Sequence, residues 1–153
     1  CYYNDPKATA EVLKEVWLFT GDMAMEDEDG FIFLVDRKKD VVISGGENIY
    51  PVQIENFLRA YDKIKDVAVI GVPDKDYGEE ILAEVILHPN QSSSEEEIKE
   101  FVLSHMAKHK VPRYVDFVSE FPMNAAGKIL KYKMREAAIE RHQLQNASKI
   151  VTA

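Results

Sequence analysis

The chain has 153 residues, 46% of them hydrophobic and 30% charged, which is typical of an ordinary globular domain. Its 19 basic and 27 acidic residues give a net charge of −8, which argues against a nucleic-acid partner, and no apolar run approaches the roughly 20 residues of a membrane span. The single cysteine, Cys1, permits no internal disulfide and favours a reducing, cytoplasmic compartment. Because the chain starts there and not at a methionine, we expect a piece of a longer polypeptide.

The first 36 residues predict a short helix followed by a β-hairpin. Residues 5–14 fit a helix with Asp5 as its N-cap and Pro6 at its first position. The turn at Asp29-Gly30 is a strong hairpin signal between two strand patterns. The expected strands span residues 16–20, 23–25 and 31–35. This piece is too small to bury its own apolar side chains, so we expect it to be the looser part of the chain.

From about residue 40 onward, the pattern predicts a compact α+β unit with a short central sheet flanked by helices. Expected strands span residues 41–43, 67–72, 81–87 and 114–118. Expected helices begin at Pro51, begin after the capping residue Ser94 and run to about His109, and span residues 129–142. We expect residues 40–142 to form the stable unit, with the hairpin as a stub before it.

Two charged side chains directly follow predicted strands in the first third of the chain. Asp22 comes after a Thr20-Gly21 turn, where a carboxylate can accept hydrogen bonds from two ribose hydroxyls. Arg37 follows the next strand, and its guanidinium can bind ribose or phosphate oxygens through two parallel hydrogen bonds. Taken singly, the same residues also fit a turn aspartate and a surface ion-pair cluster.

Two loops carry further candidates. Gly45 and Gly46 lack side chains at successive positions, so a thin ligand such as a thiol arm can approach the backbone. Lys128 lies on a loop of small residues before a predicted helix, where a mobile point charge can follow a phosphate through a reaction. By themselves these features also fit an ordinary turn and a solvated lysine. Lys131, one turn into the predicted helix, is expected to be a solvated surface charge.

In this order and spacing, the motifs resemble the adenylate-forming enzyme superfamily, which comprises acyl-CoA synthetases, carrier-protein adenylation domains and beetle luciferases. The resemblance is strongest to fatty or aromatic acyl-CoA ligases. It covers nearly the whole chain, but only the last part of a family enzyme. The segments that carry it are residues 17–22, 36–40, 44–51 and 122–131.

The resemblance implies a domain organisation and a reaction. Residues 1–36 would end the large N-terminal domain, residues 37–40 would be the hinge, and residues 41–153 would be the C-terminal lid domain. The implied enzyme is an acid–thiol ligase that uses ATP, Mg²⁺ and CoA to convert a small-molecule carboxylate through an acyl-adenylate into acyl-CoA, AMP and pyrophosphate. The partner of this segment would be the N-terminal domain of the same polypeptide. The phosphate loop that defines the family is missing from these residues, so we expect the chain alone to be inactive.

The resemblance also assigns roles to individual residues. Lys128 would be the catalytic cation of adenylation, and no metal-ligating residue is assigned. Asp22 and Arg37 would bind ATP or AMP, Lys39 would be the hinge pivot, and Gly45, Gly46 and Tyr77 would border the pantetheine arm of CoA.

Departures from the family pattern leave alternatives open. Ile43 stands where luciferases carry a second lysine, and a family arginine is absent near Lys110 and Arg113, which are weaker candidates for CoA contacts. A carrier-protein adenylation domain or an acyl-AMP ligase would keep Asp22, Arg37 and Lys128 but differ in the acceptor. A docking module without its own catalysis also fits the chain.

Overall fold

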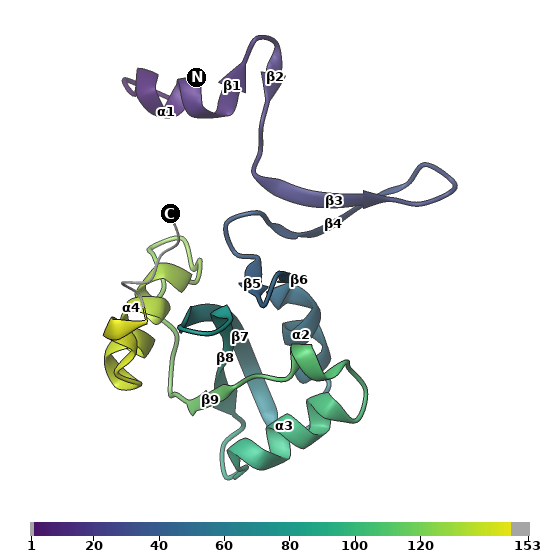
Figure 1. Ribbon diagram of the computed structural model, residues 1–153, viewed down its shortest axis with the longest axis vertical. Coiled ribbons are helices and arrows are strands. Elements are labelled where there is room, and N and C mark those ends of the chain that lie inside the picture. Colours follow the sequence, from purple (N-terminus) through teal and green to yellow (C-terminus); the bar gives the residue numbers. More distant parts are fainter. Residues whose placement is uncertain (1, 148–153) are drawn as a thin grey trace. The chain divides into compact units, whose positions relative to one another are not determined.

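The computed structural model describes residues 2–147. By its internal contacts the chain divides into a first unit, Cys1–Lys39, and a second unit that begins at Asp40 (Figure 1). Within the described residues, no helix combines the length and the apolar character needed to cross a bilayer.

The first unit begins with α1 (Pro6–Val12), which starts as predicted. The Asp5 carboxylate accepts a hydrogen bond from the Ala8 N–H at 2.9 Å and caps the helix. The helix ends before the predicted residue 14, because β1 (Leu13–Lys14) leaves it to pair with β2 (Trp17–Leu18). The local cap therefore determines where this helix begins, and a strand pairing determines where it ends.

The predicted hairpin of the first unit is confirmed. Strands β3 (Asp22–Glu26) and β4 (Ile32–Arg37) pair antiparallel, and the Asp27 carboxylate closes the turn by accepting from two backbone N–H groups. None of the residues 2–39 is buried, and the apolar side chains of Trp17 and Leu34 are 70% and 75% exposed. As predicted, this unit does not bury its apolar side chains.

The second unit is built on a five-stranded sheet. Its strands are β5 (Val42–Ser44), β6 (Glu47–Ile49), β7 (Ile64–Asp74), β8 (Gly78–Leu87) and β9 (Tyr114–Phe117). They lie in the order β6-β5-β8-β7, and β9 pairs parallel with β8. Strand β6 was not predicted. It forms because Gly45 and Gly46, both with positive φ, make a two-residue hairpin turn after β5.

The helices of the second unit are α2 (Pro51–Leu58), α3 (Glu95–Leu103) and α4 (Lys131–Arg141), with short 3₁₀ turns η1 (Lys108–Lys110) and η2 (Leu144–Asn146). The predicted cap of α3 is present, since Ser94 and Glu97 form a reciprocal capping box. The prediction that α3 runs to about His109 is wrong. The helix ends at Leu103, where the Ser104 hydroxyl donates to the Phe101 carbonyl at 2.8 Å and competes with helical pairing.

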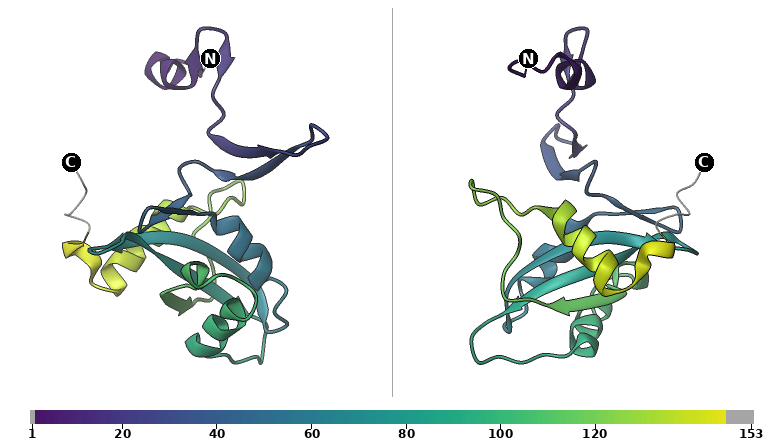
Figure 2. Two further views of the ribbon diagram at one scale, coloured as in Figure 1. Left: turned by 45° about the vertical axis from the view of Figure 1, so that its right-hand side comes forward. Right: turned by 90° about the vertical axis from the view of Figure 1, so that its left-hand side faces the viewer.

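Helices cover both faces of this sheet, with α2 and α3 on one face and α4 on the other (Figure 2). Successive residues of a strand point to opposite faces. Val67 and Val69 of β7 accordingly join the core under α2 and α3, whereas Ala68 and Ile70 join the core under α4. Two-sided burial explains why β7 has a nearly continuous apolar sequence.

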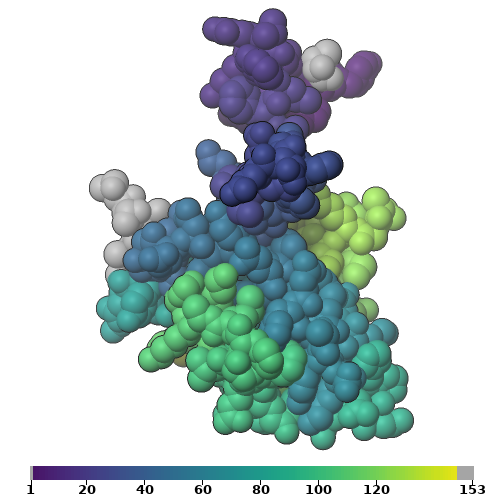
Figure 3. Space-filling view, turned by 90° about the vertical axis from the view of Figure 1, so that its right-hand side faces the viewer, coloured from purple at the N-terminus to yellow at the C-terminus, as the bar shows by residue number. Residues whose placement is uncertain are grey.

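The first of these two cores continues between the helices. The rings of Phe57 in α2 and Phe101 in α3 stack with their centres 4.7 Å apart. Figure 3 shows the green residues of α3 and the turn after it packed against the blue residues that include α2. The second unit thus has a core on each side of its sheet, and this scaffold carries the candidate loops.

Candidate functional site

Asp22 and Arg37 lie opposite each other on the hairpin of the first unit. Asp22 is the first residue of β3, Arg37 is the last residue of β4, and the antiparallel register pairs them. The Arg37 Nε lies 3.6 Å from the Asp22 Oδ1, and the two side chains are 45% and 33% exposed. They form a partly exposed ion pair, so both groups keep hydrogen-bonding atoms within reach of solvent.

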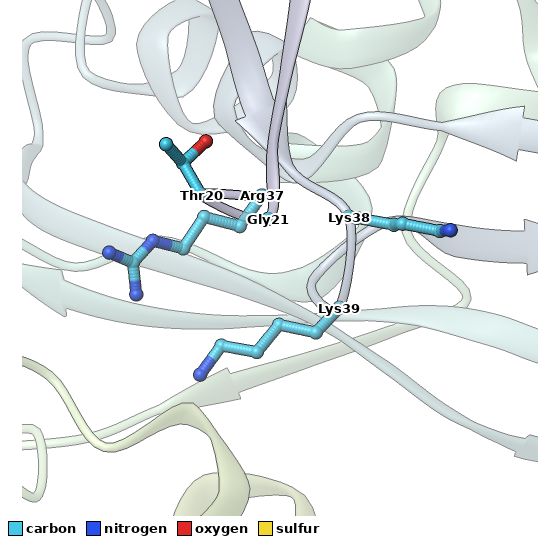
Figure 4. A pocket seen from close by; sticks show the side chains of 5 residues that line it. All are labelled: Thr20, Gly21, Arg37, Lys38 and Lys39. Carbon is cyan, nitrogen blue, oxygen red and sulfur yellow. The ribbon is translucent and has the colours of Figure 1, made fainter. Parts of the chain in front are cut away.

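A hollow with cationic walls adjoins this pair. Its volume is about 570 Å³, and its lining residues are Thr20, Gly21, Arg37, Lys38 and Lys39. The side chains of Arg37 and Lys39 extend to the same side, whereas that of Lys38 extends to the other (Figure 4). The Gly21 carbonyl accepts from the Lys38 N–H at 2.8 Å, which joins the two walls. Guanidinium and ammonium groups in such a hollow are suited to phosphate oxygens.

Gly45 and Gly46 form the turn between β5 and β6. Their φ angles are +58° and +87°, in the left-handed region that glycine adopts without steric cost. The Gly45 N–H donates to the Tyr77 carbonyl at 2.9 Å. A Cβ atom on Gly45 would lie only 3.1 Å from the Tyr77 ring. The structure therefore brings two of the predicted CoA residues into direct contact, and a side chain at Gly45 would crowd the ring.

Asp74 organises the loop that presents Tyr77. Its Oδ1 accepts from the N–H groups of Asp76 at 2.9 Å and Tyr77 at 3.0 Å. Burial opposes the charge of this carboxyl, but the two hydrogen bonds and the nearby Arg113 outweigh it and lower the pKa of Asp74. The loop backbone is thereby fixed while the Tyr77 side chain remains 53% exposed.

Lys128 lies on a narrow loop between β9 and α4 that extends away from the sheet (Figure 2, right). Asn124 fixes its backbone on both sides. The Asn124 N–H donates to the Lys128 carbonyl at 3.0 Å, and the Lys128 N–H donates to the Asn124 Oδ1 at 2.9 Å. Gly127 completes the turn with a φ of +75°. Lys128 itself is exposed, so its ammonium group is presented to solvent from a backbone that is held in place.

The prediction that Lys131 is a solvated surface charge is wrong. Its Nζ donates to the Glu55 Oε1 at 2.8 Å, and the two side chains are only 22% and 8% exposed. Sequence reasoning did not find this pair because Glu55 and Lys131 are far apart in the chain. A carboxylate among the apolar residues of α2 is the signal that could have indicated a buried partner.

The two weaker candidates for CoA contacts are engaged within the protein. The Lys110 Nζ donates to the Gln53 Oε1 at 2.8 Å, and the Arg113 guanidinium lies 5.9 Å from the centre of the Tyr114 ring. Both residues lie in the second unit, and Arg113 is exposed.

The predicted site residues therefore fall into separate groups. Asp22 and Arg37 meet in the first unit, where Lys39 lines the same hollow as Arg37. Gly45 and Tyr77 meet in the second unit, with Gly46 beside them in the turn. Lys128 is on a loop of its own. Chemically, these groups comprise a carboxylate paired with a guanidinium, a cationic hollow, a turn without side chains beside an aromatic ring, and an exposed cation.

Comparison with known proteins places this geometry in context. The sequence model of one protein family, the AMP-binding enzyme C-terminal domain, matches residues 53–128. A long-chain-fatty-acid–CoA ligase of Bacillus subtilis is 43% identical over 144 residues, which cover 94% of this chain and 26% of the ligase. The chain thus spans about a quarter of the length of that curated relative.

Solved structures show the same likeness. The amide bond synthetase McbA from Marinactinospora thermotolerans has a TM-score of 0.81 and 38% identity, over 90% of this chain and 28% of that one. ATP-bound MatB from Rhodopseudomonas palustris has a TM-score of 0.83 and 33% identity, over 92% of this chain and 28% of that one.

Proposed function

Because this chain belongs to the adenylate-forming enzymes and carries their AMP-binding C-terminal domain, we propose that it is the C-terminal part of an ATP-dependent acyl-CoA synthetase. Residues 1–36 are proposed to end the N-terminal domain, residues 37–40 to form the hinge and residues 41–153 to form the lid. The name of the Bacillus subtilis relative supports a fatty acid as the carboxylate and CoA as the acceptor.

Lys128 is the residue on which this proposal depends most. In the first half-reaction the substrate carboxylate attacks the α-phosphorus of ATP, an acyl-adenylate forms and pyrophosphate leaves. Negative charge accumulates on the phosphoryl oxygens as the reaction proceeds, and a cation that is already in position stabilises it. Lys128 fits this role, because Asn124 holds its backbone while its side chain is exposed.

The nucleotide is proposed to bind at the first unit. The Asp22 carboxylate can accept hydrogen bonds from the two ribose hydroxyls, and Arg37 can donate to ribose or phosphate oxygens. Their ion pair and the adjoining cationic hollow support this assignment. ATP is the nucleotide bound in the MatB structure to which this chain is similar.

In the second half-reaction the CoA thiolate attacks the acyl carbonyl and displaces AMP. We propose that the pantetheine arm runs past Gly45 and Gly46 and beside Tyr77, since the turn has no side chains and the ring is exposed. A rotation about Lys39 would exchange the Lys128 loop for this turn, with the change absorbed by a few backbone dihedrals.

Mg²⁺ accompanies ATP in phosphoryl-group chemistry and would neutralise phosphate charge there. Within residues 2–147, no group of three or more His, Cys, Asp or Glu side chains is arranged to hold a metal ion. The Mg²⁺ would be held mainly by the ATP phosphates and water, and the charge stabilisation assigned to this chain comes from Lys128 and Arg37.

The test is Lys128→Ala in the full-length enzyme. Adenylation, measured as carboxylate-dependent pyrophosphate release, should fall by at least about 10²–10³-fold, the usual cost of losing one preorganised electrostatic group. Thioester formation from supplied acyl-adenylate should be nearly unchanged. Lys133→Ala is the matched control, because Lys133 is an exposed lysine on α4. Normal adenylation by Lys128→Ala would show that the loop is only a surface turn.

A second acceptor is favoured by one observation. McbA, to which this chain is similar, is an amide bond synthetase. An amine could therefore replace CoA in the second half-reaction. Product analysis of the full-length enzyme with acyl-adenylate and either CoA or an amine separates the two: a thioester from CoA supports the first candidate, and an amide formed in preference to the thioester supports the second.

A further inference from the structure

Lys131 has an unfavourable local position. It is the first residue of α4, whose first turn contains no acidic residue and whose N-cap, Leu130, makes no side-chain hydrogen bond. The positive end of the helix dipole disfavours a cation at the N-terminus of α4, and no acidic residue or side-chain cap in its first turn offsets this. A carboxylate outside the helix can offset this cost.

That stabilising group is Glu55. Its Oε1 accepts from the Lys131 Nζ at 2.8 Å and from the Val69 N–H at 2.9 Å, and its residue exposure is 6%. Arg59 approaches the other carboxylate oxygen only to 3.9 Å, and its guanidinium is held by Asp66 and the Val67 carbonyl. Lys131 is consequently the close cationic partner of Glu55.

The Val69 N–H that anchors Glu55 lies on β7, the last strand in the sheet order. Side chains bind its backbone at alternate residues: Arg59 donates to the Val67 carbonyl, Glu55 accepts from Val69, and Arg135 of α4 donates to the Gly71 carbonyl at 2.7 Å. Charged side chains thus cover the edge of the sheet. Because Glu55 also binds Lys131 of α4, two of these three contacts, those of Glu55 and Arg135, attach α4 to that edge.

A short and stiff path connects Lys131 to Lys128. The Leu130 N–H donates to the Pro122 carbonyl at 2.8 Å, and Ile129 forms a β-bridge with Met123 across the loop. Asn124 then binds both the N–H and the carbonyl of Lys128. A displacement at the start of α4 is therefore transmitted to the Lys128 backbone, because the residues between them are held by backbone hydrogen bonds.

We propose that Glu55, acting through Lys131, is a positioning residue that sets the location of Lys128 for adenylation. The inference rests on the proposed function of Lys128. Glu55 does not touch the reacting atoms. It fixes the base of the loop against the sheet edge, and it holds the Lys131 ammonium at a carboxylate so that Lys131 does not compete with Lys128 for the phosphate.

The test compares Lys131→Met, Lys131→Arg, Glu55→Gln and the control Lys133→Met in the full-length enzyme. Methionine keeps the length of the stem but removes the charge, arginine keeps an ion pair, and glutamine can still accept from Val69. Lys131→Met and Glu55→Gln should each slow adenylation by about 10- to 100-fold, the order of a group displaced by about 1 Å. Lys131→Arg should restore most of that rate, and Lys133→Met should leave it unchanged.

Three further readouts separate positioning from a purely structural role. Thioester formation from supplied acyl-adenylate should be unchanged, and kcat for adenylation should fall more than KM for ATP rises. Amide exchange at Lys128 and Ala126 should become faster in Lys131→Met. The double variant Glu55→Gln with Lys131→Met should be no slower than either single variant, because both remove one interaction.

The outcomes distinguish this inference from the function on which it rests. Normal adenylation by Lys131→Met, in an enzyme that Lys128→Ala impairs, would overturn the inference and leave the proposed function standing. Equal loss of both half-reactions would also overturn it, because that result indicates general damage to the fold. If Lys128→Ala adenylated normally as well, the proposed function would fall and the inference with it.

Discussion

The two units of the chain are held together in different ways. In the first unit, α1 is capped by Asp5 and the β3–β4 turn is closed by Asp27, yet no residue from 2 to 39 is buried. In the second unit, comparable local signals are backed by a core on each face of the sheet. Local hydrogen bonds can therefore shape a segment, but only buried apolar area supplies most of the stability of a fold.

The exposed side chains of the first unit indicate what it lacks. Large apolar residues there include Trp17, Phe31, Ile32 and Leu34, each at least 66% exposed. Large apolar side chains exposed in this number are typical of a surface that packs against another protein surface. Under the proposed function, that surface belongs to the N-terminal domain of the same enzyme.

The largest effect that tests this comparison is activity with and without the rest of the enzyme. We expect the purified 153-residue chain to make no detectable thioester from ATP, a carboxylate and CoA, whereas the full-length enzyme does. The chain contains no Ser/Thr/Gly-rich phosphate loop, and none of residues 2–39 is buried. Thioester formation by the chain alone, measured by product analysis, would show that the first unit needs no partner.

The next effect concerns the junction between the units, at Lys39. Lys39→Pro fixes φ and removes a backbone donor there. In the full-length enzyme, acyl-adenylate should still form, while thioester formation should fall by about 10²-fold, as expected when a reacting group is misplaced. Rapid-quench measurement of each half-reaction tests this. Equal loss of both would argue against Lys39 as the pivot.

A matched pair of leucines tests the difference in burial directly. Leu58→Ala, at a position with 0% exposure in α2, should lower the free energy of unfolding by about 2–5 kcal/mol. Leu34→Ala, at a position with 75% exposure in β4, should change it by less than about 0.5 kcal/mol. Chemical denaturation of the chain provides both values. Similar costs for the two variants would mean that the first unit has a core after all.

The smallest effect is a pH dependence of stability expected from Glu84, a buried carboxyl of the second unit. Burial raises the pKa of Glu84, and the nearby Arg141 only partly offsets this. The contribution of Glu84 to stability is therefore full below the ordinary carboxyl pKa and is lost as pH rises through the raised value.

Glu84→Gln should accordingly flatten the change in stability from about pH 4 upward, since it removes the titrating proton. Denaturant midpoints of the two proteins across this range provide the measurement. If the wild-type chain gained stability relative to Glu84→Gln as pH rose, the carboxylate would be stabilised by Arg141 and not disfavoured by burial.

Local signals predicted the starts of elements better than their ends. The caps Asp5 and Ser94 and the helix-opening Pro51 act within one turn of the chain, so the sequence around them is sufficient. The end of α3 at Leu103 has no glycine or proline to mark it, and the pattern extended it to His109. Strand β6 was missed because its evidence was a Gly45-Gly46 turn that also fits a loop.

The features of the candidate site also divide into those that the sequence predicted and those that only the structure shows. Asp22, Arg37, Gly45, Gly46 and Lys128 were identified from short motifs, because their residue types suit a ribose, a phosphate and a thiol arm. The contacts of Asp22 with Arg37 and of Gly45 with Tyr77 required the hairpin register and the sheet order.

The sequence by itself determined the α+β class, the β3–β4 hairpin and the helix caps, because these follow from local geometry and residue spacing. Its motifs, in their order, resembled the family that the comparisons then showed. Only the tertiary structure decided that Lys131 is buried against Glu55 and not solvated. The two residues are separated by 76 positions, and their interaction exists only because the edge of β7 brings α2 and the start of α4 together. A long-range ion pair of this kind has no local pattern, since its energy depends on burial that the whole second unit creates.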